Sequence, residues 1–588
     1  MKISSFKHKI NSYFNNNESK LFDGLVNSSD SLFLSLKNTN KIIIAENNED
    51  AERIRKEILL SVGLNNEQKL IFIPGTEELP YDMVDSDKYL SSKKNLALIK
   101  YIKSNEESLT IITTVKNLQK KIIPLDILKE YTIELIVNDT IDIKKFKTKL
   151  TCIGYINNPQ VNFIGEFSIR GSIIDIFPGG YESPIRIDLD DIKIDTIKKF
   201  DTDTQITNSE NIQDKIYIVP INNIIVNEKN IINFRKRFRE IFEGNPNNNE
   251  IYTSFSNNIV PQGFNNFFPL LYENVGEFLD YFDNINDIYI FSSFNEIIDS
   301  NTRKINEKLN FAQEHKTTLL SPDYLYTEKK ELIKILKNKN LFTIEKQKVL
   351  DSHSYNYNIS SIPDISIKPY LEKPLRELEL FIKKLNYIIL VINDDNKLLN
   401  IKDILKSNKI NYKQINDFDQ IDDNNIYIIS GYLKNSFKIS DLKTAFINDK
   451  DILKDKIKQQ SNKNSVKSTF LMDQLKNLDI GSPVVHDIHG VGRYNGLQYL
   501  ETNNISNEYL TILYDENDKL YVPVSSLHLV NKYNTSENEI APLHKLGGFS
   551  WSNAKKKATK KAYDIAAELL EINAKRALKK IKLHYFGN

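Results

Sequence analysis

Several features that would point to a particular class of protein are rare or absent in this sequence. One cysteine, Cys152, stands among 588 residues, so no disulfide can form within the chain, as is usual in a reducing compartment. Positive and negative residues nearly cancel, with 79 Lys+Arg against 78 Asp+Glu, so overall charge indicates no nucleic-acid partner. No apolar run approaches the ~18 residues of a membrane helix, and the N-terminal segment lacks a signal-peptide core. We therefore expect a soluble, cytoplasmic protein without a membrane partner.

A phosphate-binding loop of the form G-x-x-x-x-G-K-[ST] is also absent from the sequence. In ATP-driven motors its backbone amides and lysine hold the nucleotide phosphates. The turn after the apolar run Lys41–Glu46 reads NNEDAERIR, which is acidic and has no glycine, so it would repel phosphate. No other catalytic arrangement stands out. We expect neither enzyme activity nor a bound cofactor or metal for this chain.

The sequence does contain the alternating strand and helix patterns of a multidomain α/β protein. Residues 1–340 alternate short apolar runs with helical periodicity, which predicts a doubly wound domain with a parallel sheet. Strict alternation between about 150 and 215 predicts an antiparallel β insert in that domain. A second, small α/β domain is predicted over 350–450, followed by a polar linker at 451–476.

A β-rich segment over residues 477–546 has the pattern of a small SH3/Tudor-like barrel. Its stretch VVHDIHGVGRYNGLQYLE contains G-x-G-x-x-x-G from Gly490 to Gly496, one residue longer than the dinucleotide fingerprint and set among antiparallel strands. We therefore interpret these glycines as turn residues. His486 and His489 flank the turn, but without a third ligand in suitable spacing they do not indicate a metal site.

Three stretches resemble one protein family. GEFSIRGSIIDIFPGGYESPIRIDLDDIKIDTIKKFDTDTQ (Gly165–Gln205) resembles the module shared by the excision-repair protein UvrB and the transcription-repair coupling factor, Mfd. IPGTEELPYDMVDSDKYLSSKKNLALI resembles the segment that precedes that module. GSPVVHDIHGVGRYNGLQYLE and the residues after it, to LHKLGGFSWSNAKKKA, resemble the RNA-polymerase-interacting domain that coupling factors share with CarD regulators. The chain is similar to the N-terminal part of a coupling factor.

The resemblance implies a non-catalytic adaptor that binds stalled RNA polymerase and recruits UvrA for transcription-coupled nucleotide excision repair. The first domain would be a degenerate, motor-like domain, and the helix expected at 549–583 would link to a motor outside this sequence. The full-length family is an ATP-dependent DNA translocase that uses ATP and Mg, and its C-terminal domain masks the UvrA site. Here DNA would be reached indirectly, and UvrA docking would be unmasked. Two alternatives stay open: a translocase whose motor is lost or encoded separately, and a CarD-like transcription regulator.

The family's UvrA-binding positions correspond to Arg170, Arg186 and Asp190. In PIRIDLD the apolar side chains alternate with polar ones, so Arg186 is expected on the wet face of a strand, with Arg170 nearby on the next strand. The family tends to have an aromatic residue at position 190, and an aspartate there is expected to weaken docking by about 1–3 kcal/mol. Without the resemblance, arginines that merely solvate a sheet edge would be the simpler interpretation. A solvated strand face likewise explains the run DLDD better than a magnesium site does.

The family's contact with the polymerase β subunit corresponds to Leu500, with Tyr499 and Glu501 beside it. If Leu497 and Tyr499 face the barrel interior, Leu500 is an exposed apolar residue near a sheet edge. Such edges are sites where a partner strand can add to a sheet. The simpler alternative is an isolated surface leucine.

Overall fold

The computed structural model describes most of the first 453 residues and part of the remainder. The described ranges are 5–15, 19–37, 39–76, 80–81, 87–104, 106–202, 204–314, 318–348, 354–367, 375–422, 426–453, 481–486, 489–502, 505–515, 518–523, 530–532, 543 and 545. The chain divides into two compact units, Met1–Asp455 and Lys456–Asn588. Across the described ranges, every helix is too short or too polar to cross a lipid bilayer. The expected helix at 549–583 and most of the expected linker lie outside them.

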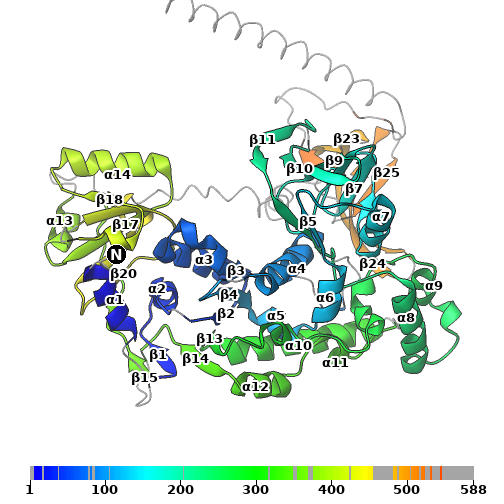
Figure 1. Cartoon of the computed structure of the whole chain (residues 1–588), viewed down its shortest axis with the longest axis horizontal. Helices are drawn as coiled ribbons and strands as arrows, with labels where there is room; N and C mark the ends of the chain where they lie inside the picture. The colour runs from blue at the N-terminus through cyan, green and yellow to red at the C-terminus, as the bar shows by residue number, and fades with distance from the viewer. Residues whose placement is uncertain are drawn as a thin grey trace, which may run out of the picture. The chain divides into compact units, whose positions relative to one another are not determined.

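The first unit begins with the predicted parallel sheet, which has seven strands in the order β15-β1-β14-β13-β2-β4-β3 (Figure 1). The strands are β1 (Leu21–Asp23), β2 (Lys41–Ala45), β3 (Leu70–Phe72), β4 (Thr110–Thr114), β13 (Asp287–Phe291), β14 (Asn340–Ile344) and β15 (Ser354–Asn356). The central strands β2 and β4 are buried along their whole length because both faces of the sheet are covered. After the insert, β13 returns to this sheet and lies between β14 and β2.

Helices cover both faces of this sheet. Ile43 and Ala45 of β2 share a core with α1 (Ser5–Asn15), α2 (Ser29–Ser35) and α3 (Asn48–Val62), while Ile42 and Ile44 share another with helices of the opposite face. The remaining helices of the domain are α4 (Lys88–Ile102), α5 (Val115–Gln119), α6 (Leu125–Tyr131), α7 (Ile143–Cys152), α8 (Glu228–Ile241), α9 (Glu250–Ser256), α10 (Phe294–Glu314), α11 (Pro322–Leu325) and α12 (Lys329–Lys337). Several start at side-chain caps, such as Asn47 before α3 and Asp87 before α4.

The predicted β insert is a six-stranded sheet in the order β11-β10-β9-β8-β7-β6. Its strands are β6 (Ile156–Asn157), β7 (Glu166–Arg170), β8 (Ile173–Ile176), β9 (Ile185–Asp190), β10 (Lys193–Phe200) and β11 (Thr207–Ile212). Neighbouring strands are antiparallel except β6 and β7. Its stem is the antiparallel pair β5 (Ile133–Ile136) and β12 (Lys215–Ile218). The inward residues of the sheet join the core of the first domain, so the insert is packed against that domain.

The second α/β domain has a six-stranded sheet in the order β16-β20-β21-β17-β19-β18. Its elements are β16 (Ile359–Ser360), α13 (Arg376–Ile382), β17 (Tyr387–Ile392), α14 (Asp395–Ser407), β18 (Lys413–Ile415), β19 (Ile426–Ser430), β20 (Phe437–Ile439), β21 (Thr444–Asn448) and α15 (Asp449–Leu453). One face of this sheet shares an apolar core with the first domain. Phe6 of α1 lies between Tyr387 and Phe418, with ring centroids 4.8 and 6.3 Å away. The two α/β domains are therefore packed through a continuous apolar layer.

A buried ionic cluster also lies where the two α/β domains meet. Arg53 of α3 contacts Asp30 of α2 at 2.8 Å and Glu57 at 2.7 Å, and all three side chains are at most 6% exposed. Glu57 also accepts hydrogen bonds from Ser28 at 2.6 Å and from the backbone N–H of Lys434, in the second domain, at 2.9 Å. Because every charge in the cluster has a partner, it can stay buried.

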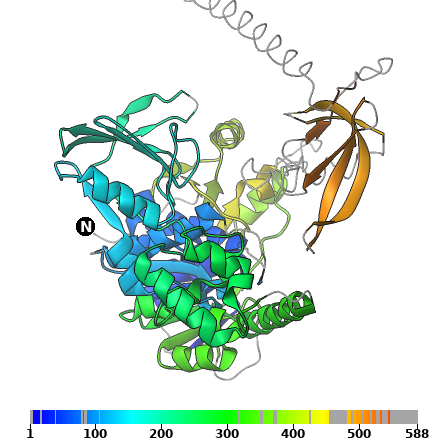
Figure 2. The same cartoon turned by 90° about the vertical axis from the view of Figure 1, so that its right-hand side faces the viewer.

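The second unit contains a five-stranded antiparallel sheet in the order β25-β24-β23-β22-β26, drawn in orange in Figure 2. The strands are β22 (Pro483–His486), β23 (Gly490–Thr502), β24 (Ile505–Leu513), β25 (Lys519–Pro523) and β26 (Val530–Lys532). The sheet has a small hydrophobic core, formed by the buried residues Val484, Leu510, Ile512, Tyr514, Val522 and Val530. This confirms a compact β-rich segment, and closure into an SH3/Tudor-like barrel stays a prediction.

Candidate functional site

The turn between β7 and β8 and the facing strand β9 carry the two predicted arginines. Arg170 ends β7, and Arg186 lies in β9 directly opposite Asp175 of β8. The side chains of β9 alternate between buried and polar, with Ile185, Ile187 and Leu189 in the core. The predicted placement of Arg186 on the polar face of the strand is therefore confirmed.

A buried carboxylate joins the two arginines. Asp175, whose side chain is 1% exposed, accepts hydrogen bonds from Nε of Arg186 at 2.7 Å and from its Nη2 at 3.0 Å. Asp175 also accepts a hydrogen bond from Nη2 of Arg170 at 2.5 Å. The prediction that Arg170 lies near Arg186 is confirmed, but its placement on the neighbouring strand was wrong, because β8 lies between β7 and β9. The carboxylate between the two arginines, on β8, was missed by sequence reasoning. The feature that could have revealed Asp175 is its position on β8, directly opposite Arg186 of β9.

The two arginines differ in how far they reach into solvent. The side chain of Arg186 is only 18% exposed. It also donates to the backbone oxygen of Gln205 at 3.2 Å and lies over the Phe200 ring, 5.0 Å from its centroid. The hydrogen bond to Asp175 raises the pKa of Arg186, so this guanidinium is charged at any physiological pH. Arg170 is 54% exposed and makes one described hydrogen bond with its five N–H donors, so it is the arginine that can contact a partner.

The third predicted residue, Asp190, lies at the hairpin end of the same sheet. It is exposed and pairs with Lys193 across the turn between β9 and β10. Asp191, in that turn, has φ of +55°, which is unusual for a residue other than glycine. Ile192 beside it is 52% exposed. The hairpin end therefore presents an acidic and an apolar side chain, and both project from the sheet that holds the arginines.

The turn after β2, where a phosphate-binding loop would lie, is filled by polar groups of the chain itself. The side chain of Asn48 accepts a hydrogen bond from the backbone N–H of Gly75 and donates one to its oxygen, both at 2.7 Å. Ser293 donates a hydrogen bond to Glu46. Asn47 accepts from the backbone N–H of Asp50 at 2.9 Å. The first turn of α3 is thus capped by side chains and also carries acidic residues, which disfavour phosphate.

The glycines of the second unit have structural roles. Gly490 has φ of +85° where β23 begins after the β22 turn. A Cβ on Gly492 would lie 2.5 Å from Cγ2 of Ile512 and 2.8 Å from the backbone oxygen of Leu513, so β24 packs against this position too closely for any other residue. In the turn itself, the backbone N–H of His489 donates to Nδ1 of His486 at 3.4 Å. These contacts support the interpretation of the glycine-rich stretch as part of an antiparallel sheet.

Gly496 marks a β-bulge in the middle of β23. The register with β24 shifts between Tyr494 and Leu497, where two residues of β23 face one residue of β24, and Gly496 has φ of +91°. A bulge of this kind bends the strand and increases its twist. The part of β23 beyond Gly496 is therefore directed differently from the part that pairs with β22.

The predicted polymerase-binding residues lie beyond this bulge. Tyr499, Leu500 and Glu501 pair in backbone register with Glu508, Asn507 and Ser506 of β24. Their side chains lie outside the part of the chain that the structure describes. The pairing of β22 with β23 ends at Arg493, so among the described residues the opposite edge of β23 at Leu497–Thr502 has no strand beside it. In general, an unpaired strand edge of this kind can accept a further strand.

Comparisons with known proteins match these two regions to two described domains. A family model for the UvrB interaction domain matches residues 133–223, which contain the stem, the arginines and Asp175. A family model for the CarD-like/TRCF RID domain matches residues 478–534, which contain β22–β26. One chain thus contains matches to both domain models.

The curated relatives that match the chain in sequence are transcription-repair-coupling factors. The protein from Haemophilus influenzae is 31% identical over 523 residues, which are 87% of this chain and 45% of that protein. The protein from Escherichia coli is 30% identical over 92% of this chain and 47% of its own length. The protein from Bacillus subtilis is 25% identical over 98% of this chain and 50% of its own length. The chain is similar to transcription-repair-coupling factors and spans about half the length of these relatives, consistent with the expected match to their N-terminal part.

Proposed function

We propose that this chain is an adaptor that binds RNA polymerase through its CarD-like domain and UvrA through its β insert, and so brings repair proteins to stalled transcription. The observation that carries the proposal is the presence of both matched domains in one chain whose relatives are transcription-repair-coupling factors. The arginine pair held by Asp175 gives the first docking surface its charge. Residues Leu497–Thr502 of β23 pair with β24 on one side, and their backbone groups on the other side give the second surface its hydrogen-bonding groups.

The UvrA surface is centred on Arg170, because its guanidinium reaches solvent, while Arg186 supports the shared carboxylate from the buried side. A partner carboxylate can bind the remaining donors of Arg170 in a forked, charge-assisted pair. Affinity for purified UvrA should fall by about 1–2 kcal/mol in Arg170→Ala, as for one truncated contact at an interface. Arg303→Ala, an exposed arginine on α10, is the matched control. Equal affinities for the two variants would remove Arg170 from the docking surface.

The polymerase surface is the edge of β23 around Leu500, where a strand of the polymerase β subunit would extend the sheet. Leu500→Arg should abolish co-purification with the β subunit. Leu399→Arg, an equally drastic change at a leucine that is 61% exposed on α14, should leave it intact. Binding of polymerase together with failure to bind UvrA would instead support the CarD-like regulator.

We infer that this chain does not hydrolyse ATP by itself. The sequence lacks the phosphate-binding loop, and the turn after β2 is occupied by Asn48 and Glu46. A phosphate-release assay on the purified chain, with and without double-stranded DNA, should remain at the rate of the buffer blank. Turnover above the blank would support the translocase alternative.

A further inference from the structure

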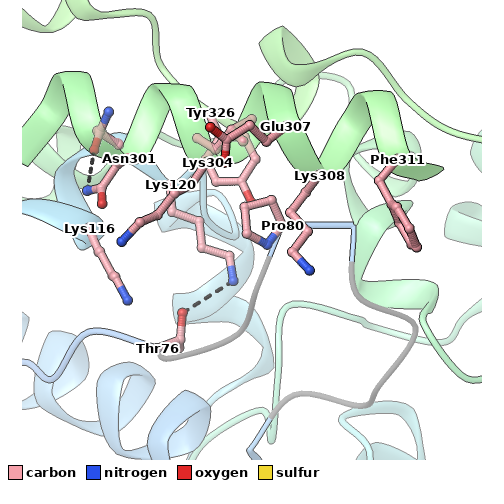
Figure 3. Close-up of a pocket in the computed structure, with 12 residues that line it drawn as sticks. Thr76, Pro80, Lys116, Lys120, Asn301, Lys304, Glu307, Lys308, Phe311 and Tyr326 are labelled. Atoms are coloured by element: carbon pink, nitrogen blue, oxygen red, sulfur yellow. Dashed lines mark hydrogen bonds between the residues drawn. The ribbon is translucent and has the colours of Figure 1, made fainter. Parts of the chain in front are cut away.

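A pocket of about 420 Å³ lies on the first α/β domain, on residues separate from the insert hairpins that carry the arginines (Figure 3). It is formed by the loop after β3, by α5 after β4 and by α10 after β13. Its size is within the range of small-molecule sites, about 300–1,000 Å³. The lining residues used below are Thr76, Pro80, Lys116, Lys120, Lys304, Lys308 and Phe311.

The pocket has an excess of positive charge. Lys116 and Lys120 are spaced by four residues, as are Lys304 and Lys308 on α10, so each pair points to one side of its segment. Glu307 is the single acid among the described lining residues. Across the described ranges, Lys116, Lys304 and Lys308 form no ion pair, whereas Lys329 nearby bonds Asp299 at 2.6 Å. The described lining residues thus carry four lysines against one glutamate, and such an excess of positive charge attracts an anionic ligand.

Hydrogen bonds fix the walls of this pocket relative to one another. The buried amide of Gln119, on α5, accepts from Nδ2 of Asn301 on α10 at 2.9 Å. Lys120 donates to Oγ1 of Thr76 at 3.3 Å, which ties the same segment to the loop after β3. The lysines therefore stand on a preformed frame, so a ligand would not have to order these elements on binding.

One end of the pocket offers apolar surface beside this charge. Phe311 of α10 is 60% exposed and lies next to Lys308, with Pro80 across from them (Figure 3). An exposed aromatic ring can stack on a flat heterocycle, and a neighbouring lysine can bind a phosphate attached to it. The pocket thus combines a ring-binding end with an anion-binding wall.

We propose that this pocket is a binding site for a small phosphorylated molecule that carries a flat ring, of the nucleoside diphosphate class. Lys116, Lys304 and Lys308 bind the phosphates, and Phe311 contacts the ring. The site holds its ligand without turning it over, because no catalytic group or phosphate-binding loop accompanies it. It is independent of the two docking surfaces.

The test is isothermal titration of the whole chain at low ionic strength with adenosine diphosphate, inorganic pyrophosphate and adenosine as separate probes. Adenosine diphosphate should bind with a Kd of about 0.1–1 mM, pyrophosphate more weakly and adenosine not measurably. The double variant Lys304→Glu, Lys308→Glu should weaken diphosphate binding by about tenfold or more, because it reverses two charges. Phe311→Ala should weaken adenosine diphosphate about tenfold and leave pyrophosphate unchanged. Lys334→Glu with Lys337→Glu on α12 is the matched control and should not change binding.

Two results would overturn the proposal. The first is equal binding by the pocket variant and the α12 control. The second is a single-stranded oligonucleotide that binds tighter than adenosine diphosphate and is weakened by the same lysine changes, since the partner would then be nucleic acid. Circular dichroism of each variant confirms that it is folded.

Discussion

Asp175 binds Arg186 through both of its carboxylate oxygens, at 2.7 and 3.0 Å, and holds Arg170 through the second oxygen at the same time. One buried negative charge therefore sets the position of two positive ones on the polar face of the insert. The docking surface thus depends on a residue that a partner would hardly touch.

Replacing Asp175 should therefore affect UvrA binding indirectly. Asp175→Asn keeps the shape but removes the charge, which leaves Arg186 half-buried beside a weaker acceptor and should destabilise the first unit by about 1–3 kcal/mol. UvrA affinity should fall as well because Arg170 loses its anchor. Denaturant unfolding and titration with UvrA measure the two effects. Asp188→Asn, on the same sheet and bound to Lys198 at 3.5 Å near the surface, should change stability much less.

Restoring an aromatic residue at position 190 should strengthen docking. Asp190→Phe removes an exposed negative charge at the hairpin end of the sheet that holds the arginines and adds an apolar anchor, with an expected gain of about 1–3 kcal/mol in UvrA binding. Titration with UvrA measures the gain. Asp403→Phe, at an exposed position of α14, controls for general stickiness. A gain of the same size in that control would show that the effect is not specific to the hairpin.

A methyl group at Gly492 should destabilise the sheet of the second unit. The added Cβ would lie 2.5 Å from Cγ2 of Ile512, so β23 and β24 would have to separate, at a cost of about 1–3 kcal/mol. The same change should reduce polymerase binding, because the edge around Leu500 is on β23. Hydrogen exchange of the β24 amides measures the first effect. Gly171→Ala, where an added Cβ has no atom within 4 Å, should leave these amides unchanged.

Stability of the first unit should depend on pH through Glu57. Burial raises the pKa of Glu57 above its ordinary value of 4.5, so between these two values the folded chain holds a proton that the unfolded chain has lost. The contribution of Glu57 to the free energy of unfolding is therefore fully present below pH 4.5. It is lost as the pH rises through the pKa of Glu57 in the folded chain. Glu57→Gln should remove that slope from unfolding curves measured across the window.

Glu49→Gln is the control for this pH dependence. The hydrogen bond from Lys434 lowers the pKa of the Glu49 carboxyl, so its contribution has the opposite sign and is lost as pH falls. The carboxyl is also well exposed, so its effect is small. Replacing Glu49 should leave the Glu57 slope in place, and a flat profile in both variants would contradict the assignment.

Sequence periodicity predicted well the strands that are buried either on both faces or on one face. The runs KIIIA and YIILVI, covered on both faces, and the alternating PIRIDLD, covered on one, have burial patterns that match their apolar positions. The placement of Arg186 on the polar face of β9 followed from the same alternation. Asp175 was missed because its role depends on cross-strand register, which alternation alone does not give. The Arg53 cluster and the lysine pocket bring together residues distant in sequence, so local pattern carries no sign of them.

The shared apolar cores also have a mechanical consequence. One core joins the β insert to the first α/β domain, and another joins that domain to the second, through Phe6, Tyr387 and their neighbours. Moving one of these parts against another would expose buried apolar side chains to water, at a cost of about 25 cal/mol per Å². We therefore expect the β insert and the two α/β domains to move as one body.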